Sequence, residues 1–278
     1  MSYQRRIDRL SPSLIIIMVD QSESMSEAIG GGTMSKAQAV ADQLNTLLYE
    51  LVLRCVKSAR EAPRAYFFVS VIGYSTTSHG DPIVESALSM ASASGGVVST
   101  TDLAAQPLRV ENRAGAAGGA VNSPVWVEPV ARGGTPMCGA FDRAGRLSAE
   151  WVERHPDAFP PVIVNLTDGE ATDGDPALWA SRLRSLSTSD GQVLLFNLSL
   201  SADSAAVGIF PSGTEGLGSA YAAKLFHMSS LLPPPMIDMA RSQGIAVRPG
   251  AHGFAYNADI KALATFMNVG TSIGRVAR

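Results

Sequence analysis

Residues 14–24, Leu-Ile-Ile-Ile-Met-Val-Asp-Gln-Ser-Glu-Ser, constrain the fold of this chain most strongly. Six apolar residues open the segment, and the carboxylate Asp20 follows them. A short apolar run that is rich in β-branched residues is typical of a strand buried on both faces, as in the centre of a parallel sheet. Ser22 and Ser24 then lie just beyond the carboxyl end of that strand, where open α/β sheets bind their ligands.

Two later segments repeat parts of this pattern. Residues 161–166 form another short apolar run, and Asp168 follows it. Thr135 stands after two glycines and before a proline, so it can be the N-cap of a helix over 136–155. Because the carboxyl ends of neighbouring parallel strands meet at one edge of a sheet, we expect these side chains to approach Asp20.

Strands and helices alternate along the chain, which predicts the α/β class. We expect a Rossmann-like, doubly wound and mainly parallel sheet that is flanked by helices and has one antiparallel edge strand. The main predicted strands cover 13–19, 66–74, 161–166, 192–200 and 251–256. The predicted helices cover 37–60, 136–155, 175–188, 219–227, 235–243 and 258–274.

The predicted domain organisation is simple. Residues 1–12 are polar and are expected to form an N-terminal arm, and residues 13–278 are expected to form a single domain. Residues of about 86–130 carry weak periodicity and many small side chains, so we expect an irregular insertion there with only short strands.

The composition argues against several classes of function. The formal net charge is −3 and only 17% of residues are charged, so a nucleic-acid-binding surface is not expected. Lysines are few and dispersed, the first six residues show no apolar region typical of a secretory signal, and no apolar run approaches the length of a membrane span. Cys55 and Cys138 form no Cys-x-x-Cys pair, which fits a reducing compartment. We therefore expect a cytoplasmic protein that binds neither nucleic acid nor membranes.

Asp20, Ser22, Ser24, Thr135 and Asp168 are the predicted metal ligands. Their hard oxygen donors suit Mg²⁺, with Mn²⁺ or Ca²⁺ as alternatives. Two carboxylates and three hydroxyls do not saturate such an ion, so several positions would hold water. An open position can accept an acidic side chain of another protein, and the metal would then bridge the two molecules.

Three motifs in this chain order resemble the metal-ion-dependent adhesion site of the von Willebrand factor A (vWA) domain family. They are Val19-Asp20-Gln21-Ser22-Glu23-Ser24-Met25, Gly133-Gly134-Thr135-Pro136 and Leu166-Thr167-Asp168-Gly169. The resemblance extends over roughly residues 11–275 and implies a Rossmann-like fold. It also implies that Ser22, Ser24 and Thr135 contact the metal through their hydroxyls, while Asp20 and Asp168 act directly or through water.

Two further features qualify the resemblance. Glu23 stands where this family often has glycine, which could alter the affinity for the metal. The segment Lys224-Leu-Phe-His-Met-Ser-Ser-Leu-Leu-Pro is similar to stand-alone bacterial members of the tellurite-resistance type. That second resemblance implies kinase and phosphatase partners, and a role in a stress, tellurite-resistance or defence system.

We therefore predict a Mg²⁺-dependent protein-interaction module with no catalytic residues. One alternative is a Mg²⁺-dependent phosphoryl-transfer enzyme with Asp20 as the nucleophile, but that chemistry needs an acid at the position that Ser22 occupies. Another alternative is a vWA subunit of an AAA+ chaperone or chelatase assembly. The chain has no Walker motif, so the ATPase would be a separate protein.

Overall fold

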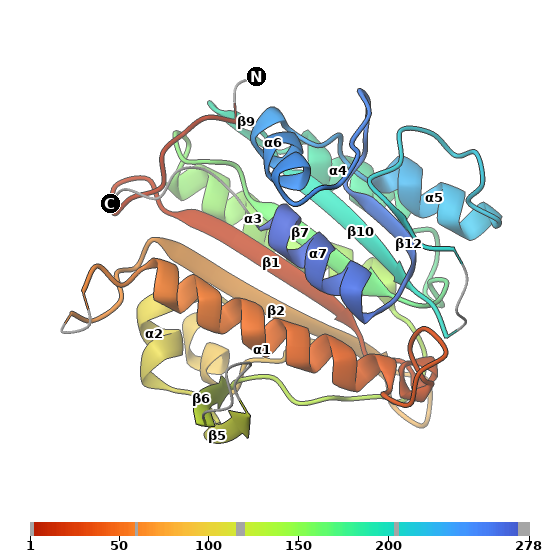
Figure 1. The fold of residues 1–278 in the computed structure, drawn as a ribbon, viewed down its shortest axis with the longest axis horizontal. Coiled ribbons are helices and arrows are strands. Elements are labelled where there is room, and N and C mark those ends of the chain that lie inside the picture. Colours follow the sequence, from red (N-terminus) through yellow and green to blue (C-terminus); the bar gives the residue numbers. More distant parts are fainter. Residues whose placement is uncertain (1–2, 59–60, 115–119, 203–205, 272–278) are drawn as a thin grey trace.

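Strand β1 (Ser13–Asp20) lies in the interior of a mixed sheet that helices cover on both faces (Figure 1). The computed structural model describes residues 3–58, 61–114, 120–202 and 206–271. The other strands of this sheet are β2 (Phe67–Thr76), β3 (Pro82–Ser86), β4 (Val98–Ser99), β7 (Val162–Thr167), β10 (Leu194–Leu200), β11 (Gly208–Ile209) and β12 (Phe254–Ala258). Within the described residues the strand order is β11-β12-β10-β7-β1-β2-β3, and β4 also pairs with β2.

The sheet has the predicted mainly parallel arrangement. Strands β12, β10, β7, β1 and β2 run parallel to one another. The expected antiparallel edge strand is present, and the structure places one at each edge, since β3 pairs antiparallel with β2 and β11 with β12. Along the chain, β2 is added on one side of β1 and β7 on the other. The carboxyl ends of β1 and β7 therefore form a topological switch point.

Helices cover the two faces of the sheet. They are α1 (Lys36–Arg54), α2 (Thr100–Ala105), α3 (Met137–Arg154), α4 (Ala177–Ser185), α5 (Ala220–Met228), α6 (Pro234–Ser242) and α7 (Ile260–Gly270). Side chains of β1 alternate between two cores, as the pleat of a strand requires. Ile15, Ile17 and Val19 pack in the core with α1, α6 and α7. The intervening residues of β1 pack in the core with α3, α4 and α5.

Helix α1 ends at Arg54, earlier than the predicted end at Arg60. The last apolar position of its buried face is Val52, and the buried Cys55 is the C-cap. The chain then turns back toward β2, and the backbone N–H of Arg64 donates to the carbonyl of Cys55 at 3.0 Å. The predicted helix over 258–274 corresponds to α7, and residues 272–274 lie outside the described residues.

The N-terminal residues contact a distant part of the chain. The backbone N–H groups of Gln4 and Arg5 donate to the carboxylate of Asp190 at 3.1 and 3.0 Å, and Ile7 is fully buried. The boundary between arm and domain stays a prediction, because these contacts say nothing about independent folding.

The segment 86–130 contains several short elements. They are η2 (Ser89–Ser94), β4, α2 and the hairpin of β5 (Arg109–Ala114) and β6 (Ala120–Val125). Its C-terminal part is fixed to α1, because the Asn45 side chain accepts from the backbone of Trp126 at 2.8 Å and donates to the Val127 carbonyl at 2.9 Å. Residues 115–119 lie outside the described residues.

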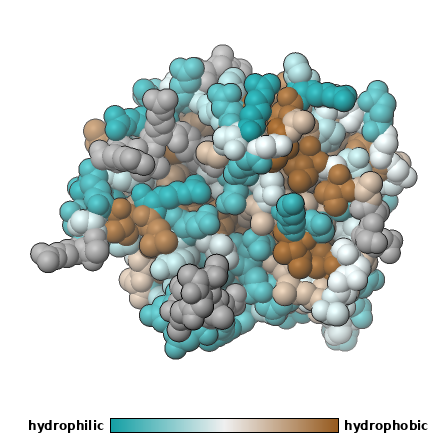
Figure 2. Space-filling model, viewed as in Figure 1, coloured by the Kyte–Doolittle hydropathy of each residue, from teal (hydrophilic) through white to brown (hydrophobic). Residues whose placement is uncertain are grey.

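The surface viewed in Figure 2 is mixed. Hydrophobic residues form several patches that hydrophilic residues separate from one another. Among the described residues, no helix combines the length and the apolar character needed to cross a membrane. A second small hairpin, β8 (Ser187–Thr188) with β9 (Gly191–Gln192), lies between α4 and β10 in the chain.

Candidate metal centre

Asp20 is the last residue of β1 and is fully buried. Its Oδ1 accepts from the backbone N–H of Ser22 at 2.9 Å, and its Oδ2 accepts from the Thr167 hydroxyl at 2.8 Å. Burial raises the pKa of Asp20 from 3.8 to about 6, although the hydrogen bonds from Ser22 and Thr167 oppose this rise. A buried carboxylate whose ionised form is this costly is well suited to receive a cation.

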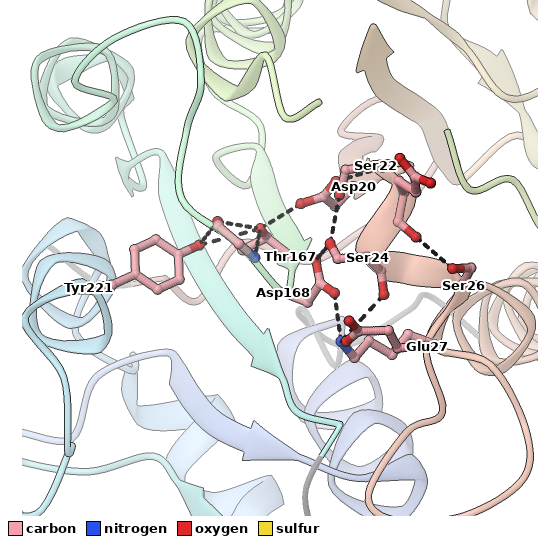
Figure 3. A network of polar contacts seen from close by, with 11 residues as sticks. Asp20, Ser22, Ser24, Ser26, Glu27, Thr167, Asp168 and Tyr221 are labelled. Atoms are coloured by element: carbon pink, nitrogen blue, oxygen red, sulfur yellow. Dashed lines mark hydrogen bonds and ion pairs between the residues drawn. The ribbon is translucent and has the colours of Figure 1, made fainter. Parts of the chain in front are cut away.

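Ser22 and Ser24 turn their hydroxyls toward each other across the first turn after β1. Ser22 is the N-cap of the short helix η1 (Glu23–Ser26), and its Oγ lies 3.1 Å from the Oγ of Ser24. The Ser24 hydroxyl donates to Oδ1 of Asp168 at 2.8 Å (Figure 3). The first motif is therefore in direct contact, through Ser24, with the carboxylate of Asp168 that follows β7.

Asp168 follows the end of β7, which is one of the two parallel neighbours of β1. Its side chain has no exposed surface, and its Oδ2 lies 2.7 Å from the Nζ of Lys36. Lys36 is the first residue of α1, its side chain is only 4% exposed, and its Nζ also lies 2.8 Å from Oε2 of Glu27. One oxygen of Asp168 thus faces a serine hydroxyl, and the other is paired with an ammonium group.

Backbone hydrogen bonds between two loops place Thr135 at the same edge of the sheet. The N–H of Arg132 donates to the Gln21 carbonyl at 2.7 Å, and the N–H of Glu23 donates to the Gly133 carbonyl at 2.9 Å. The Thr135 hydroxyl lies beside the backbone of Gly169, where a methyl group on Gly169 would be 3.8 Å from it. The segment that carries Thr135 therefore lies beside the segments that carry Asp20 and Asp168.

The predicted capping role of Thr135 is wrong. Helix α3 begins at Met137, and the carboxylate of Asp173 accepts from the N–H groups of Cys138 and Gly139 at 3.0 and 2.9 Å. A carboxylate near the helix N-terminus satisfies these donors and also interacts favourably with the positive end of the helix dipole. Within the described residues, the Thr135 hydroxyl makes no hydrogen bond and so stays available to a ligand.

The residues present fit a small divalent cation. The structure brings together all five predicted ligands, and their donors are the hard oxygens that Mg²⁺ and Mn²⁺ prefer. Across the part of the chain that the structure describes, no group of three or more His, Cys, Asp or Glu residues gathers for a metal. A metal here would depend on the serine and threonine hydroxyls. Its binding by these residues stays a prediction.

Glu23, which stands where the resembling family often has glycine, has an exposed side chain. Its backbone N–H contributes one of the two hydrogen bonds between the loops, and that contact does not depend on the side chain. The glutamate is therefore compatible with the arrangement of the other motif residues.

Three residues of the centre were missed in the sequence. Lys36, Thr167 and Tyr221 all contact residues of the three motifs. A lysine as the first residue of a helix is a usable signal, since the helix dipole disfavours a cation there. Thr167 is adjacent to a predicted ligand, but only the register of β7 against β1 shows that it faces Asp20.

Tyr221 connects helix α5 to the centre. Its hydroxyl donates to the carbonyl of Gly169 and lies 3.3 Å from the hydroxyl of Thr167 (Figure 3). Thr167 in turn donates to Asp20. Burial raises the pKa of the Tyr221 phenol, so it remains a hydrogen-bond donor at neutral pH. No sequence pattern relates this helical residue to the strand ends.

Comparisons with known proteins bear on the fold. No family model and no curated protein matches the chain. The pilus adhesin SpaC from Lactobacillus rhamnosus GG is similar in structure, with 12% identity and a TM-score of 0.52 over 97% of this chain and 32% of the adhesin. The chain therefore spans about a third of the adhesin's length.

Two weaker similarities accompany it. The ArnB paralogue VWA2 from Sulfolobus acidocaldarius is 13% identical, with a TM-score of 0.35 over 68% of this chain and 35% of that one. The manganese-loaded TRAP protein from Plasmodium vivax is 14% identical, with a TM-score of 0.34 over 70% of this chain and 59% of that one.

The chain has the von Willebrand factor A fold, which confirms the resemblance at the level of the fold. At these identities the comparisons concern the fold alone, and they do not distinguish a tellurite-resistance type from other proteins with this fold.

Proposed function

We propose that this chain is a protein-interaction module that depends on a divalent metal ion. Ser22, Ser24 and Thr135 would hold the ion together with Asp20 and Asp168, and a carboxylate of the partner would complete its coordination. The observation that carries the proposal is the convergence of these five oxygen donors, from three separate segments, at the switch point of the sheet. Mg²⁺ is the expected ion, with Mn²⁺ or Ca²⁺ as alternatives.

The buried position of Asp20 favours binding over phosphoryl transfer. A nucleophile must reach the substrate, whereas Asp20 is fully buried and both of its oxygens accept hydrogen bonds. A phosphatase with Asp20 as its nucleophile would need an acid at position 22. That position holds Ser22, whose hydroxyl does not titrate near neutral pH. A turnover assay with Mg²⁺ and a phosphomonoester tests the alternative directly.

The proposed setting is the cytoplasm of a bacterium, in a stress, tellurite-resistance or defence system. Its support is the resemblance of residues 224–233, which run from the middle of α5 to the residue before α6. The proposed partners are proteins with an exposed acidic side chain, such as kinase, phosphatase or AAA+ components. Neither nucleic acid nor a membrane is proposed as a partner.

Metal titration with two matched serine variants tests the proposal. Ser24 and Ser26 belong to the same short helix, but the Ser24 hydroxyl donates to Asp168 whereas the Ser26 hydroxyl donates to the backbone carbonyl of Glu23. Calorimetric titration of Mn²⁺ and Mg²⁺ into EDTA-treated protein should show saturable binding that Ser24→Ala and Thr135→Ala weaken at least about tenfold. Ser26→Ala should bind like the wild type.

Equal binding by Ser24→Ala and Ser26→Ala, or no binding by the wild type, would refute the proposed centre. The second stage is capture of partners with and without EDTA. Partner binding that survives both EDTA and Thr135→Ala would show that the interaction does not use the metal.

A further inference from the structure

Lys36 occupies a position that costs free energy unless its charge is compensated. It is the first residue of α1, where the helix dipole opposes a cation, and its side chain is only 4% exposed. Its ammonium group lies 2.7 Å from Asp168 and 2.8 Å from Glu27. The two partners differ, because the Glu27 side chain is 57% exposed while that of Asp168 has no exposed surface. The buried pair is therefore Lys36 with Asp168.

This pair divides the two oxygens of Asp168. Oδ1 accepts from Ser24, whose hydroxyl lies 3.1 Å from that of Ser22, so this oxygen faces the predicted ligands. Oδ2 is taken by the ammonium group of Lys36. Asp168 can therefore offer only one oxygen on the ligand side as long as Lys36 keeps its place.

Lys36 also changes the charge of the centre. The carboxylates of Asp20 and Asp168 and the ammonium of Lys36 together carry a net charge of −1. A divalent ion would bring this buried set to +1, whereas with a neutral residue at position 36 it would be brought only to 0. A positive centre repels a cation that approaches it and attracts a carboxylate, and both effects are strong where water is largely excluded.

We propose that Lys36 adjusts the two binding steps in opposite directions: it weakens the binding of the divalent metal and strengthens the binding of a partner carboxylate to the loaded centre. This inference rests on the proposed function, because it names the residue that sets the preference of the loaded centre for an anionic ligand. A purely structural lysine would not produce opposite effects, since its loss would weaken both steps together.

Substitutions at the two ends of α1 test the inference. Lys57 is exposed and lies just beyond the other end of this 19-residue helix, roughly 27 Å along its axis. Lys57→Met changes the net charge as Lys36→Met does, so it controls for long-range electrostatics. Mn²⁺ affinity is measured by calorimetry. Acetate, a minimal carboxylate, is then titrated into the Mn²⁺-loaded protein while water-proton relaxation reports the water that it displaces.

Lys36→Met should bind Mn²⁺ at least about tenfold more tightly than the wild type, and its loaded form should bind acetate at least about threefold more weakly. Lys57→Met should match the wild type in both steps, and Lys36→Arg should stay close to it because the charge is kept. Lys36→Gln retains a hydrogen-bond donor toward Asp168, disturbs the packing less and must give the same two signs.

The outcomes separate this inference from the proposed function. Wild-type binding of Mn²⁺ with equal or weaker binding by both Lys36→Met and Lys36→Gln overturns the role of Lys36 and leaves the metal centre standing. Mn²⁺ binding that appears only in the two neutral variants overturns the proposed function and this inference with it, because the wild type would then have no loaded centre for a carboxylate to bind. No binding by any of the proteins overturns both proposals.

Discussion

Replacing Asp20 by Asn should stabilise the metal-free protein while removing its ability to bind metal. Burial raises the pKa of Asp20 from 3.8 to about 6. That difference corresponds to about 3 kcal/mol by which the ionised carboxylate destabilises the folded state at neutral pH. The loss of charge-assisted hydrogen bonds offsets part of the gain, so we expect a net stabilisation of about 1–3 kcal/mol.

Asparagine can keep both hydrogen bonds of Asp20. Its carbonyl oxygen can accept from the N–H of Ser22, and its amide can donate to the Thr167 hydroxyl, which also lies 3.0 Å from the Gly169 carbonyl and can donate there. The substitution therefore removes a charge with little change in packing. Since the neutral amide lacks the second anionic oxygen, metal binding should be lost.

The pH dependence gives the sign of the effect. Because the folded-state pKa of about 6 lies above the unfolded value of 3.8, the folded protein holds the Asp20 proton more tightly. The wild type should therefore gain stability as the pH falls through about 6, and the gain should be complete below about pH 4. The difference in stability between Asp20→Asn and the wild type should shrink over the same interval.

Urea unfolding in EDTA at a series of pH values measures this difference, and the comparison of the two proteins cancels the titration of all other carboxylates. If Asp20→Asn is no more stable than the wild type at neutral pH, or if the difference does not depend on pH, then the carboxylate is not held at the expense of stability. The reasoning about the burial of Asp20 would then be wrong.

Two further predictions concern the surroundings of the centre. Tyr221→Phe removes the hydroxyl that donates to Gly169, so it should lower the free energy of unfolding by about 1 kcal/mol in urea unfolding; an unchanged value would show that this contact is replaced by water. Gly133 has a φ of +63° and lies against β2, so Gly133→Ala should cost about 2–4 kcal/mol and weaken Mn²⁺ binding. Gly145 lies within α3 with open space around it, so Gly145→Ala should instead raise the free energy of unfolding by about 0.5–1 kcal/mol. Equal effects of the two substitutions would contradict the argument from the positive φ of Gly133.

The predicted strands lie close to the observed ones because buried parallel strands have a simple signature. The run before Asp20 is continuous and apolar, the run before Asp168 is mostly so, and the structure buries every residue of β1 and β7. The edge strand β11 was harder to predict. β11 consists of only two residues, Gly208 and Ile209, and its pairing with β12 depends on which strand lies beside it rather than on its own sequence.

The start of α3 also could not be predicted from the local sequence. A threonine before a proline is a sound local capping pattern, yet the donors of α3 are satisfied by Asp173, which lies 35 residues after Cys138. A carboxylate that reaches the helix from a distant loop can displace a local cap, and only the folded chain decides between them. The consequence is functional, because Thr135 is left free to act as a ligand.

The sequence by itself shows that oxygen donors follow two buried strands. In a parallel sheet the carboxyl ends of the strands lie at one edge, so these donors are expected to meet there. It therefore predicted Asp20, Ser22, Ser24, Thr135 and Asp168 as one group. Only the tertiary structure decided that Lys36 and Tyr221 belong beside them. Both residues come from helices. A lysine at the start of a helix is an unusual residue that the sequence does show, but which residues it contacts depends on how the helix packs on the sheet. The charge of the centre thus became visible only in the folded protein.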